Sequence, residues 1–352
     1  MLKDKLEINL ITYNRKNYLK KTLEQIFADN SPVKNYGITI LDNASTDGTS
    51  ELIEEYVKKY PNIKHVRHNK NIGGNANICR AYEMAAKEYV WVLCDDDLLD
   101  FSNWNEIENA IFSNKYDMIY TINYLSGWAQ NLKHTIPVLL FWASFVPGVI
   151  YRTSYIDATL LANMYGTIST WFPQATLAIN ILINNNGIYF VPQKNIVNRV
   201  TVDNLDGKIF HRGQNMSSEH PDLLRMYWHV GYMKALKLVK DKKMRESLSQ
   251  KVHFTEDFHQ TDKDYIKFVL DYNAKYKNNN IDNYWDIFRC ISKKYKIYMI
   301  YYILFGKYIN IKSIIQTIFS IKNTPSKSHK MLTFLGLKFK FRKNNNCQKK
   351  KV

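Results

Sequence analysis

The sequence predicts an α/β fold in which a mostly parallel sheet is flanked by helices. Two observations carry this prediction. Short apolar strands alternate with amphipathic helices along residues 6–122, which is typical of parallel strands joined by crossover helices. In addition, each of the first four strands ends in a polar or glycine-rich segment. Such segments gather at the carboxyl edge of a parallel sheet, where ligands bind.

The elements are expected in this order. Leu6–Thr12 is a first strand, and 17–28 is a helix with Leu19, Leu23 and Ile26 on one face. Strands 36–41, 63–67 and 89–93 alternate with helices 50–59 and 75–87. A helix near 104–112 and a strand at 117–122 follow. In the middle of the chain, the pattern predicts a strand at 146–151, helices at 153–162 and 171–184, and a strand at 187–191.

Beyond about residue 215 the strand signals fade, and helical patterns cover 219–240, 243–258, 263–277 and 283–304. We expect a domain at 1–215, a helical C-terminal region at 216–322 and a flexible basic tail at 323–352. Residues 287–352 hold 16 Lys or Arg and no Asp or Glu, so most of the net charge of +17 lies there.

Composition excludes several classes of protein. The four cysteines show no paired spacing, which argues against a disulfide framework or a zinc site and fits a reducing compartment. The N-terminus has no signal-peptide pattern. No uncharged apolar run reaches about 18 residues, so we predict no transmembrane helix.

The most informative segment is an apolar strand that runs directly into Asp95, Asp96 and Asp97. Three adjacent carboxylates repel one another unless a cation joins them, and hard divalent ions prefer oxygen ligands. A metal–nucleotide site is one interpretation. The alternative is an acidic cap at a helix N-terminus, where aspartate is also favoured.

The other strand ends favour the ligand site. Thr12-Tyr13-Asn14-Arg15 follows the first strand, and the turn-forming segment 42–49 follows the second. In that segment Asp42 could accept a hydrogen bond from a base. Asn69 to Asn75 follows the third strand, and Gly73 and Gly74 would let the backbone approach phosphates at a helix N-terminus. Four such loops on one edge indicate one site.

These four segments, in this order and spacing, resemble the family 2 glycosyltransferases of the GT-A fold over residues 6–99. The resemblance implies a nucleotide-sugar donor, commonly a UDP-sugar, transfer with inversion, and Mn²⁺ or Mg²⁺. It implies that Asp42 reads the base, that Asp95 lies near the ribose and that Asp97 binds the metal, with Asp96 secondary. The residues expected at the nucleotide are Thr12, Tyr13, Asn14, Arg15, Asp42, Asn43, Asn69, Gly73, Gly74, Asn77, Arg80, Asp95, Asp96 and Arg212.

The expected metal ligands are Asp95, Asp97 and, as a third ligand from a later segment, His211. Trp171 and Trp142 are candidates for stacking on an acceptor sugar, although abundant aromatic residues more often belong to a core. An inverting enzyme needs a general base, and the family usually places an acid near position 171. This chain has none between 166 and 174. Asp203 and Asp206 are therefore the base candidates, whereas Asp157 reads as a surface residue.

The basic, aromatic C-terminal segments, including 331–342, suit an anionic membrane surface. Nucleic acid is ranked below membrane because nothing resembles a nucleic-acid-binding fold, and a solvated tail without a partner is the third option. We therefore expect a cytoplasmic enzyme, peripheral on the inner face of a bacterial plasma membrane, that acts on a surface glycan such as capsule or lipooligosaccharide. The alternative functions are a nucleotidyltransferase acting on sugar phosphates and a non-catalytic protein of the same fold that binds a glycan or a lipid.

Overall fold

The computed structural model describes residues 1–122, 136, 139–140, 142–168, 173–184, 187–192, 194–198, 235–236, 238–249, 319–323, 329–334 and 337–342. The chain forms two compact units, Met1–Phe258 and His259–Val352. The first unit contains the predicted α/β fold, and its carboxyl sheet edge carries the candidate site.

A seven-stranded sheet is the centre of the first unit. Its strands are β1 (Leu6–Thr12), β2 (Gly37–Asp42), β3 (Ile63–Arg67), β4 (Tyr89–Cys94), β6 (Met118–Tyr120), β7 (Val149–Arg152) and β8 (Ile188–Phe190), in the order β3-β2-β1-β4-β7-β6-β8. The strands β1 to β4 are mutually parallel, and β7 is antiparallel to both of its neighbours. A two-stranded ribbon pairs β5 (Leu98–Leu99) with β9 (Val197–Asn198).

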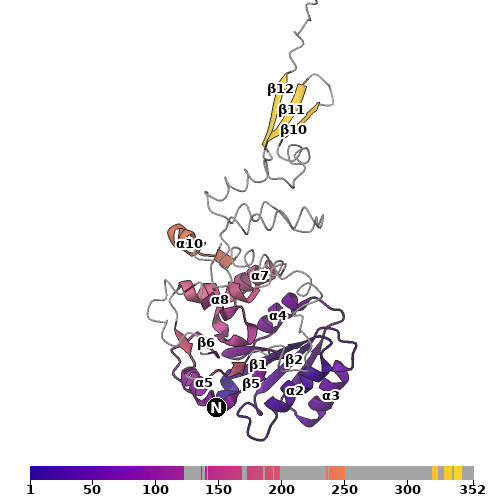
Figure 1. Cartoon of the computed structure of the whole chain (residues 1–352), viewed down its shortest axis with the longest axis vertical. Coiled ribbons are helices and arrows are strands. Elements are labelled where there is room, and N and C mark those ends of the chain that lie inside the picture. The colour runs from indigo at the N-terminus through magenta and orange to yellow at the C-terminus, as the bar shows by residue number, and fades with distance from the viewer. Residues whose placement is uncertain are drawn as a thin grey trace, which may run out of the picture. The chain divides into compact units, whose positions relative to one another are not determined.

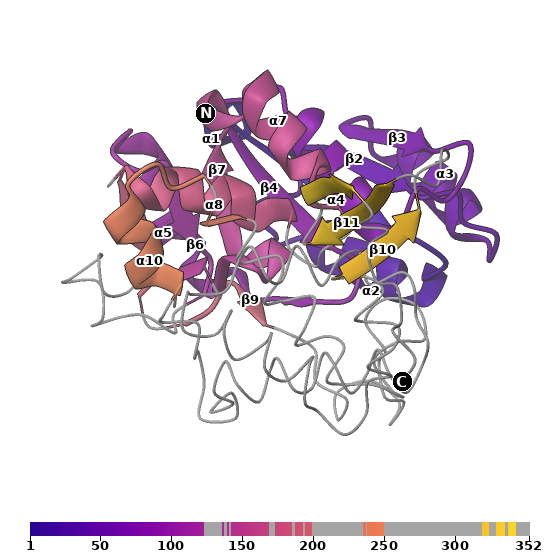
Figure 2. The same ribbon diagram turned by 90° about the horizontal axis from the view of Figure 1, so that it is seen from above.

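Helices cover both faces of this sheet. The helices are α1 (Leu2–Lys5), α2 (Lys16–Ile26), α3 (Thr49–Lys59), α4 (Gly74–Glu83), α5 (Trp104–Phe112), α7 (Ala158–Tyr165), α8 (Pro173–Ile183) and α10 (Lys242–Ser249), with single 3₁₀ turns η1 (Phe101–Asn103), η3 (Val146–Gly148) and η4 (Thr153–Tyr155). Figure 1 shows α2, α3 and α5 on one face of the sheet and α4, α7 and α8 on the other. Seen from above in Figure 2, α4, α7 and α8 lie in front of the strands.

The core explains why these segments adopt this arrangement. Alternate residues of β1, Leu6, Ile8 and Leu10, are fully buried and pack in one cluster with Leu19 and Leu23 of α2. These are the helix positions that the sequence pattern placed on one face. The central strand β4 is buried on both sides along its length, as expected for a strand covered by helices on both faces.

Three details differ from the sequence-based expectation. The segment expected as helix 153–162 divides into η4 and α7, because Asp157 caps α7 by accepting a hydrogen bond from the Leu160 N–H at 2.7 Å. The strand expected from residue 146 begins at Val149, after η3, which contains Pro147. The aspartate triplet does not cap a helix: it forms the turn between β4 and β5.

The C-terminal unit contains a three-stranded antiparallel sheet, β10 (Phe319–Asn323), β11 (His329–Phe334) and β12 (Leu337–Arg342). The sequence predicted a helical region up to residue 322 and a flexible basic tail at 323–352, whereas β10 begins at Phe319. The alternation of apolar and basic residues in Leu337–Arg342 has a period of two, which is a strand pattern. The domain division at 215 and 322 stays a prediction. In the part of the chain that the structure describes, no helix has the length and apolar character needed to cross a bilayer.

Candidate functional site

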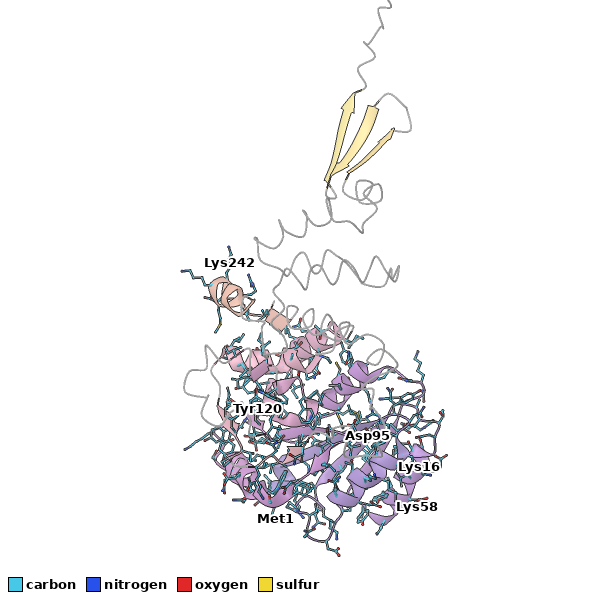
Figure 3. All side chains as sticks on the ribbon, viewed as in Figure 1. Met1, Lys16, Lys58, Asp95, Tyr120 and Lys242 are labelled. Carbon is cyan, nitrogen blue, oxygen red and sulfur yellow. The ribbon has the colours of Figure 1, made fainter. Side chains whose placement is uncertain are left out.

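The carboxyl ends of β1 and β4 are joined by a buried hydrogen bond. The parallel register aligns Ile11 with Cys94, so the next residues of the two strands, Thr12 and Asp95, meet at the sheet edge. The Thr12 hydroxyl donates to Asp95 Oδ2 at 2.6 Å, and both side chains are buried. Figure 3 shows Asp95 inside the domain, whereas Lys58 lies on its outer surface.

Arg15 provides the counter-charge for the triplet. Its Nη1 lies 3.0 Å from Asp95 Oδ1 and 2.8 Å from Asp96 Oδ2. Burial raises the pKa of Asp95, and Arg15 partly offsets that rise. Burial in turn lowers the pKa of Arg15, but the two carboxylates outweigh it and leave its pKa above the ordinary value. Arg15 therefore stays charged and holds two of the three aspartates in place.

The loop after β2 is tied to the loop after β1. The Asn14 N–H donates to Ser45 Oγ at 2.9 Å, and Asn14 Oδ1 accepts from the Thr46 N–H at 2.7 Å. Asn14 has φ 51° and Ala44 has φ 64°, a left-handed conformation that asparagine tolerates and alanine rarely adopts. These hydrogen bonds fix the backbone of two predicted nucleotide loops against each other.

Asp42 holds this second loop rather than facing an open site. It is completely buried, its Oδ1 accepts from the Ser45 N–H at 2.8 Å, and its Oδ2 accepts from Ser50 Oγ. Burial raises the pKa of Asp42, but hydrogen bonds from neighbouring groups lower it more, so that its pKa lies well below the ordinary value. The geometry gives Asp42 a role in organising the loop. Its predicted contact with a base stays a prediction that this burial does not favour.

The third loop is anchored to the second and then opens to solvent. Asn43 donates through Nδ2 to Asn71 Oδ1 at 2.9 Å, and its Oδ1 accepts from the Ile72 N–H at 2.9 Å. Gly73 has φ 87° and ψ 152° and caps α4, in a region that only glycine readily adopts. A Cβ added at Gly73 or Gly74 would meet no atom within 4 Å. The start of α4 therefore borders open space. Asn69 is exposed in the same loop, and Tyr13 is partly buried after β1.

Two residues expected at the nucleotide have other positions. Asn77 is buried, with its Nδ2 donating to the Leu41 carbonyl at 3.3 Å and its Oδ1 bonded to His68 Nε2 at 2.9 Å. Arg80 lies six residues beyond Gly74, about 9 Å along the helix axis, and pairs with Glu83 at 2.7 Å. Asn77 is thus a packing residue, and Arg80 lies away from the start of α4.

A group of possible metal ligands lies at the end of β4 and includes Asp97 of the predicted set; the predicted ligands Asp95 and His211 stay predictions. Ligand atoms of Cys94, Asp96 and Asp97 all lie within 4.8 Å of one another. Asp95 is held by Thr12 and Arg15, and Asp96 also pairs with Arg15. The two carboxylates suit a hard divalent ion such as Mn²⁺ or Mg²⁺, whereas the thiol is a softer ligand, so it is the carboxylates that fit the expected metal. Cys94 was not among the predicted ligands, although it directly precedes the triplet in the sequence.

The remaining predicted site residues are not brought into this site by the described structure. Trp142 is partly buried, in the segment that precedes η3. Asp157 is a helix cap. Trp171, Asp203, Asp206, His211 and Arg212 lie outside the described residues, and their roles stay predictions.

Known proteins resemble this chain over the region that forms the candidate site. Residues 8–161 match the family model "Glycosyl transferase family 2". The abequosyltransferase RfbV of Salmonella typhimurium is 37% identical over 89 residues, which are 25% of this chain and 27% of that protein. The poly(ribitol-phosphate) beta-glucosyltransferase of Bacillus spizizenii is 28% identical over 96 residues, 27% of this chain and 15% of that protein. The aligned region thus spans less than a third of either relative.

Among solved structures, S. aureus TarS 1-349 in complex with UDP-GlcNAc superposes with a TM-score of 0.54 at 15% identity, covering 96% of this chain and 99% of that one. A second TarS structure gives a TM-score of 0.53 at 14% identity, covering 96% of this chain and 60% of that one. At this identity the similarity shows a shared fold. The mostly parallel sheet, the four strand-end loops and the family match lead to one conclusion: residues 8–161 are a family 2 glycosyltransferase domain with the GT-A fold.

Proposed function

We propose that this protein transfers a sugar, with inversion, from a UDP-sugar to a glycan acceptor in bacterial surface polysaccharide or lipooligosaccharide synthesis. The observation that carries the proposal is the hydrogen-bonded convergence of the β1, β2 and β4 ends. There Thr12 contacts Asp95, Asn14 contacts Ser45 and Arg15 contacts two aspartates. This edge is where a parallel sheet binds nucleotides.

The start of α4 provides the anion-binding part of the proposed donor site. Gly73 and Gly74 border open space, so a diphosphate could approach the backbone closely. The N–H groups of the first turn and the helix dipole favour negative charge there. Exposed Asn69 and Asn14 lie in the loops that flank this position and would supply polar contacts to the nucleotide.

We assign the metal, Mn²⁺ or Mg²⁺, to Asp97 with Asp96, and propose Cys94 as an additional ligand only for the softer Mn²⁺. When bound, such an ion stabilises the negative charge that develops on the leaving nucleoside diphosphate. Arg15 keeps Asp95 and Asp96 at fixed positions next to the ion site. In this scheme Asp95 is a positioning residue and not a ligand, and His211 stays the proposed third-segment ligand.

For inversion, a base must remove the proton from the acceptor hydroxyl. Asp157 is unsuited, because its carboxylate caps α7. We keep Asp203 and Asp206 as the base candidates, with Trp142 and Trp171 as acceptor contacts and Arg212 as a phosphate contact. Asp203→Asn and Asp206→Asn should each be measured with saturating donor, because loss of the base lowers kcat while donor binding persists.

The primary test is a screen of nucleotide-sugars with Mn²⁺ and with Mg²⁺, in which released UDP and released pyrophosphate are measured separately. Release of UDP that is lost in Asp97→Ala supports the transferase. Asp100→Ala is the control, because Asp100 caps η1 three residues further on. Release of pyrophosphate would instead identify a nucleotidyltransferase. Metal-dependent binding without turnover for any donor would identify a non-catalytic protein.

We also propose that the basic C-terminal region binds an anionic membrane surface, which would make the protein peripheral on the cytoplasmic side. Two observations support this proposal. Residues 287–352 contain 16 Lys or Arg and no Asp or Glu, and apolar and basic residues alternate regularly in β12. Replacing Lys338, Lys340 and Arg342 by Gln in the full chain should reduce flotation with anionic liposomes. Replacing Lys349, Lys350 and Lys351 changes the charge equally and is the control. Equal flotation of wild type with anionic and neutral liposomes would contradict the proposal.

A further inference from the structure

His65, on the edge strand β3, lies between two carboxylates. Its Nδ1 is 2.5 Å from Glu54 Oε1 on α3, and its Nε2 is 3.8 Å from Asp42 Oδ2 at the end of β2. The Nε atom of Arg67, two residues further along β3, is 3.4 Å from the same Asp42 oxygen. In the described residues, Asp42, Glu54 and Arg67 are the charged groups that face His65 or its partner carboxylate. Only 9% of the His65 side chain is exposed.

This arrangement favours a protonated imidazole ring. Glu54 accepts the Nδ1 proton, and the 3.8 Å separation at Nε2 is too long for a hydrogen bond, so this contact is electrostatic. A neutral ring with its proton on Nδ1 would direct the Nε2 lone pair at the Asp42 carboxylate. Burial lowers the pKa of His65, but its interactions with Asp42 and Glu54 raise it more, giving a net pKa above the ordinary value.

Asp42 connects His65 to the two loops of the proposed donor site. It accepts from the Ser45 N–H and from Ser50, and the Ser45 hydroxyl accepts from the Asn14 N–H. Arg67 supports the same loop by donating to the Ser45 carbonyl at 2.9 Å. Because arginine keeps its charge at all relevant pH values, His65 is the member of this group that can switch its charge between about pH 6 and 8.

We infer that His65 is a positioning residue that, when protonated and held by Glu54, fixes the Asp42 loop, and that nucleotide binding therefore weakens as His65 loses its proton. This inference rests on the proposed function. It assigns no chemical step to His65, so it concerns donor affinity and leaves kcat at saturating donor unchanged. Loss of one partly buried charge contact should weaken binding by about fivefold.

The test uses the full-length protein and three readouts. The pKa of His65 is measured by NMR, the exchange protection of the Ser45 amide by hydrogen exchange corrected for intrinsic rate, and the affinity for UDP with Mn²⁺ by calorimetry, each between pH 5.5 and 9. We expect the protection and the affinity to fall together with the midpoint of the His65 titration. Glu54→Gln should move all three midpoints to lower pH, and Glu54→Asp should restore most of the shift.

Glu55→Gln is the matched control, because Glu55 is an exposed neighbour on the same helix and carries the same charge. His65→Gln should remove the pH dependence of both protection and affinity. The inference is overturned if Ser45 protection stays constant through the His65 titration, or if Glu55→Gln shifts the midpoints as much as Glu54→Gln. If the protection follows His65 but UDP does not bind at any pH, the proposed function fails instead.

Discussion

Replacement of Arg15 by Met should destabilise the protein strongly, although Arg15 lies in a loop. The substitution leaves Asp95, whose side chain is 3% exposed, with Thr12 as its side-chain hydrogen-bond donor. Removing one member of a buried ion pair costs about 3–5 kcal/mol. Because a quarter of the Arg15 side chain is exposed, we take the lower end, about 3 kcal/mol. For a domain of this size that corresponds to a fall in Tm of about 6–12 °C.

A double-mutant cycle separates the ion pair from the packing of the Arg15 side chain. Asp95→Asn removes the charge, so Arg15→Met should cost far less in that background, with a coupling free energy of about 2 kcal/mol. Thermal and urea denaturation of the four full-length proteins measures it. Lys20→Met is the control, because Lys20 and Glu24 form an exposed pair at 3.9 Å, for which about 0.3–0.5 kcal/mol is expected. Additive effects of Arg15→Met and Asp95→Asn would refute the reasoning.

Four further predictions concern the loops and the metal centre. Ala44→Gly should stabilise the protein by about 0.5–1 kcal/mol in urea denaturation, because Ala44 has φ 64°; a loss of stability would contradict the assigned conformation. Gly73→Ala should destabilise by about 1–3 kcal/mol, whereas Gly74→Ala should leave Tm nearly unchanged and weaken UDP binding, as measured by calorimetry. Cys94→Ser should remove the ultraviolet thiolate band that Cd²⁺ induces in the wild type. The variant should also show a smaller ratio of Mn²⁺ affinity to Mg²⁺ affinity than the wild type. An unchanged band would exclude Cys94 as a ligand. Because the pKa of His65 is raised in the folded state, its stabilisation is complete below about pH 6.5 and is lost as pH rises through the folded pKa. As the pH rises from about 6.5 through the folded pKa of His65, the urea midpoint should fall in the wild type but not in His65→Gln.

The fold of the N-terminal unit was predictable because its signals are local. The apolar period of Lys16–Ile26 and the continuous apolar run of Tyr89–Cys94 each correspond to one element. Short crossover helices then leave few arrangements other than a parallel sheet. The antiparallel direction of β7 was not predictable from such signals. An antiparallel strand has the same local sequence pattern as a parallel one, and its direction depends on partners distant in sequence.

The site was predictable as a location but less so as a set of contacts. Thr12, Asn14, Arg15 and the aspartate triplet do meet at one edge, as the order of the strand ends implied. Which side chains face outward depends on hydrogen bonds that no spacing encodes. Asn77, for example, looks like a ligand-binding residue one turn into a helix, yet its amide bonds to the Leu41 carbonyl.

The triplet shows why a motif alone underdetermines its chemistry. Three consecutive aspartates need not all bind one ion, because Thr12 and Arg15 already contact the Asp95 carboxylate. Asp96, which also pairs with Arg15, and Asp97 have ligand atoms within 4.8 Å of that of Cys94. Among the described residues, Arg15 pairs with Asp95 and Asp96, and three carboxylates in one turn favour binding of a divalent cation. In the proposed function, a divalent cation bound by Asp96 and Asp97 would supply the opposite charge to the diphosphate of the donor. The metal and the donor are therefore expected to bind cooperatively, each with higher affinity in the presence of the other.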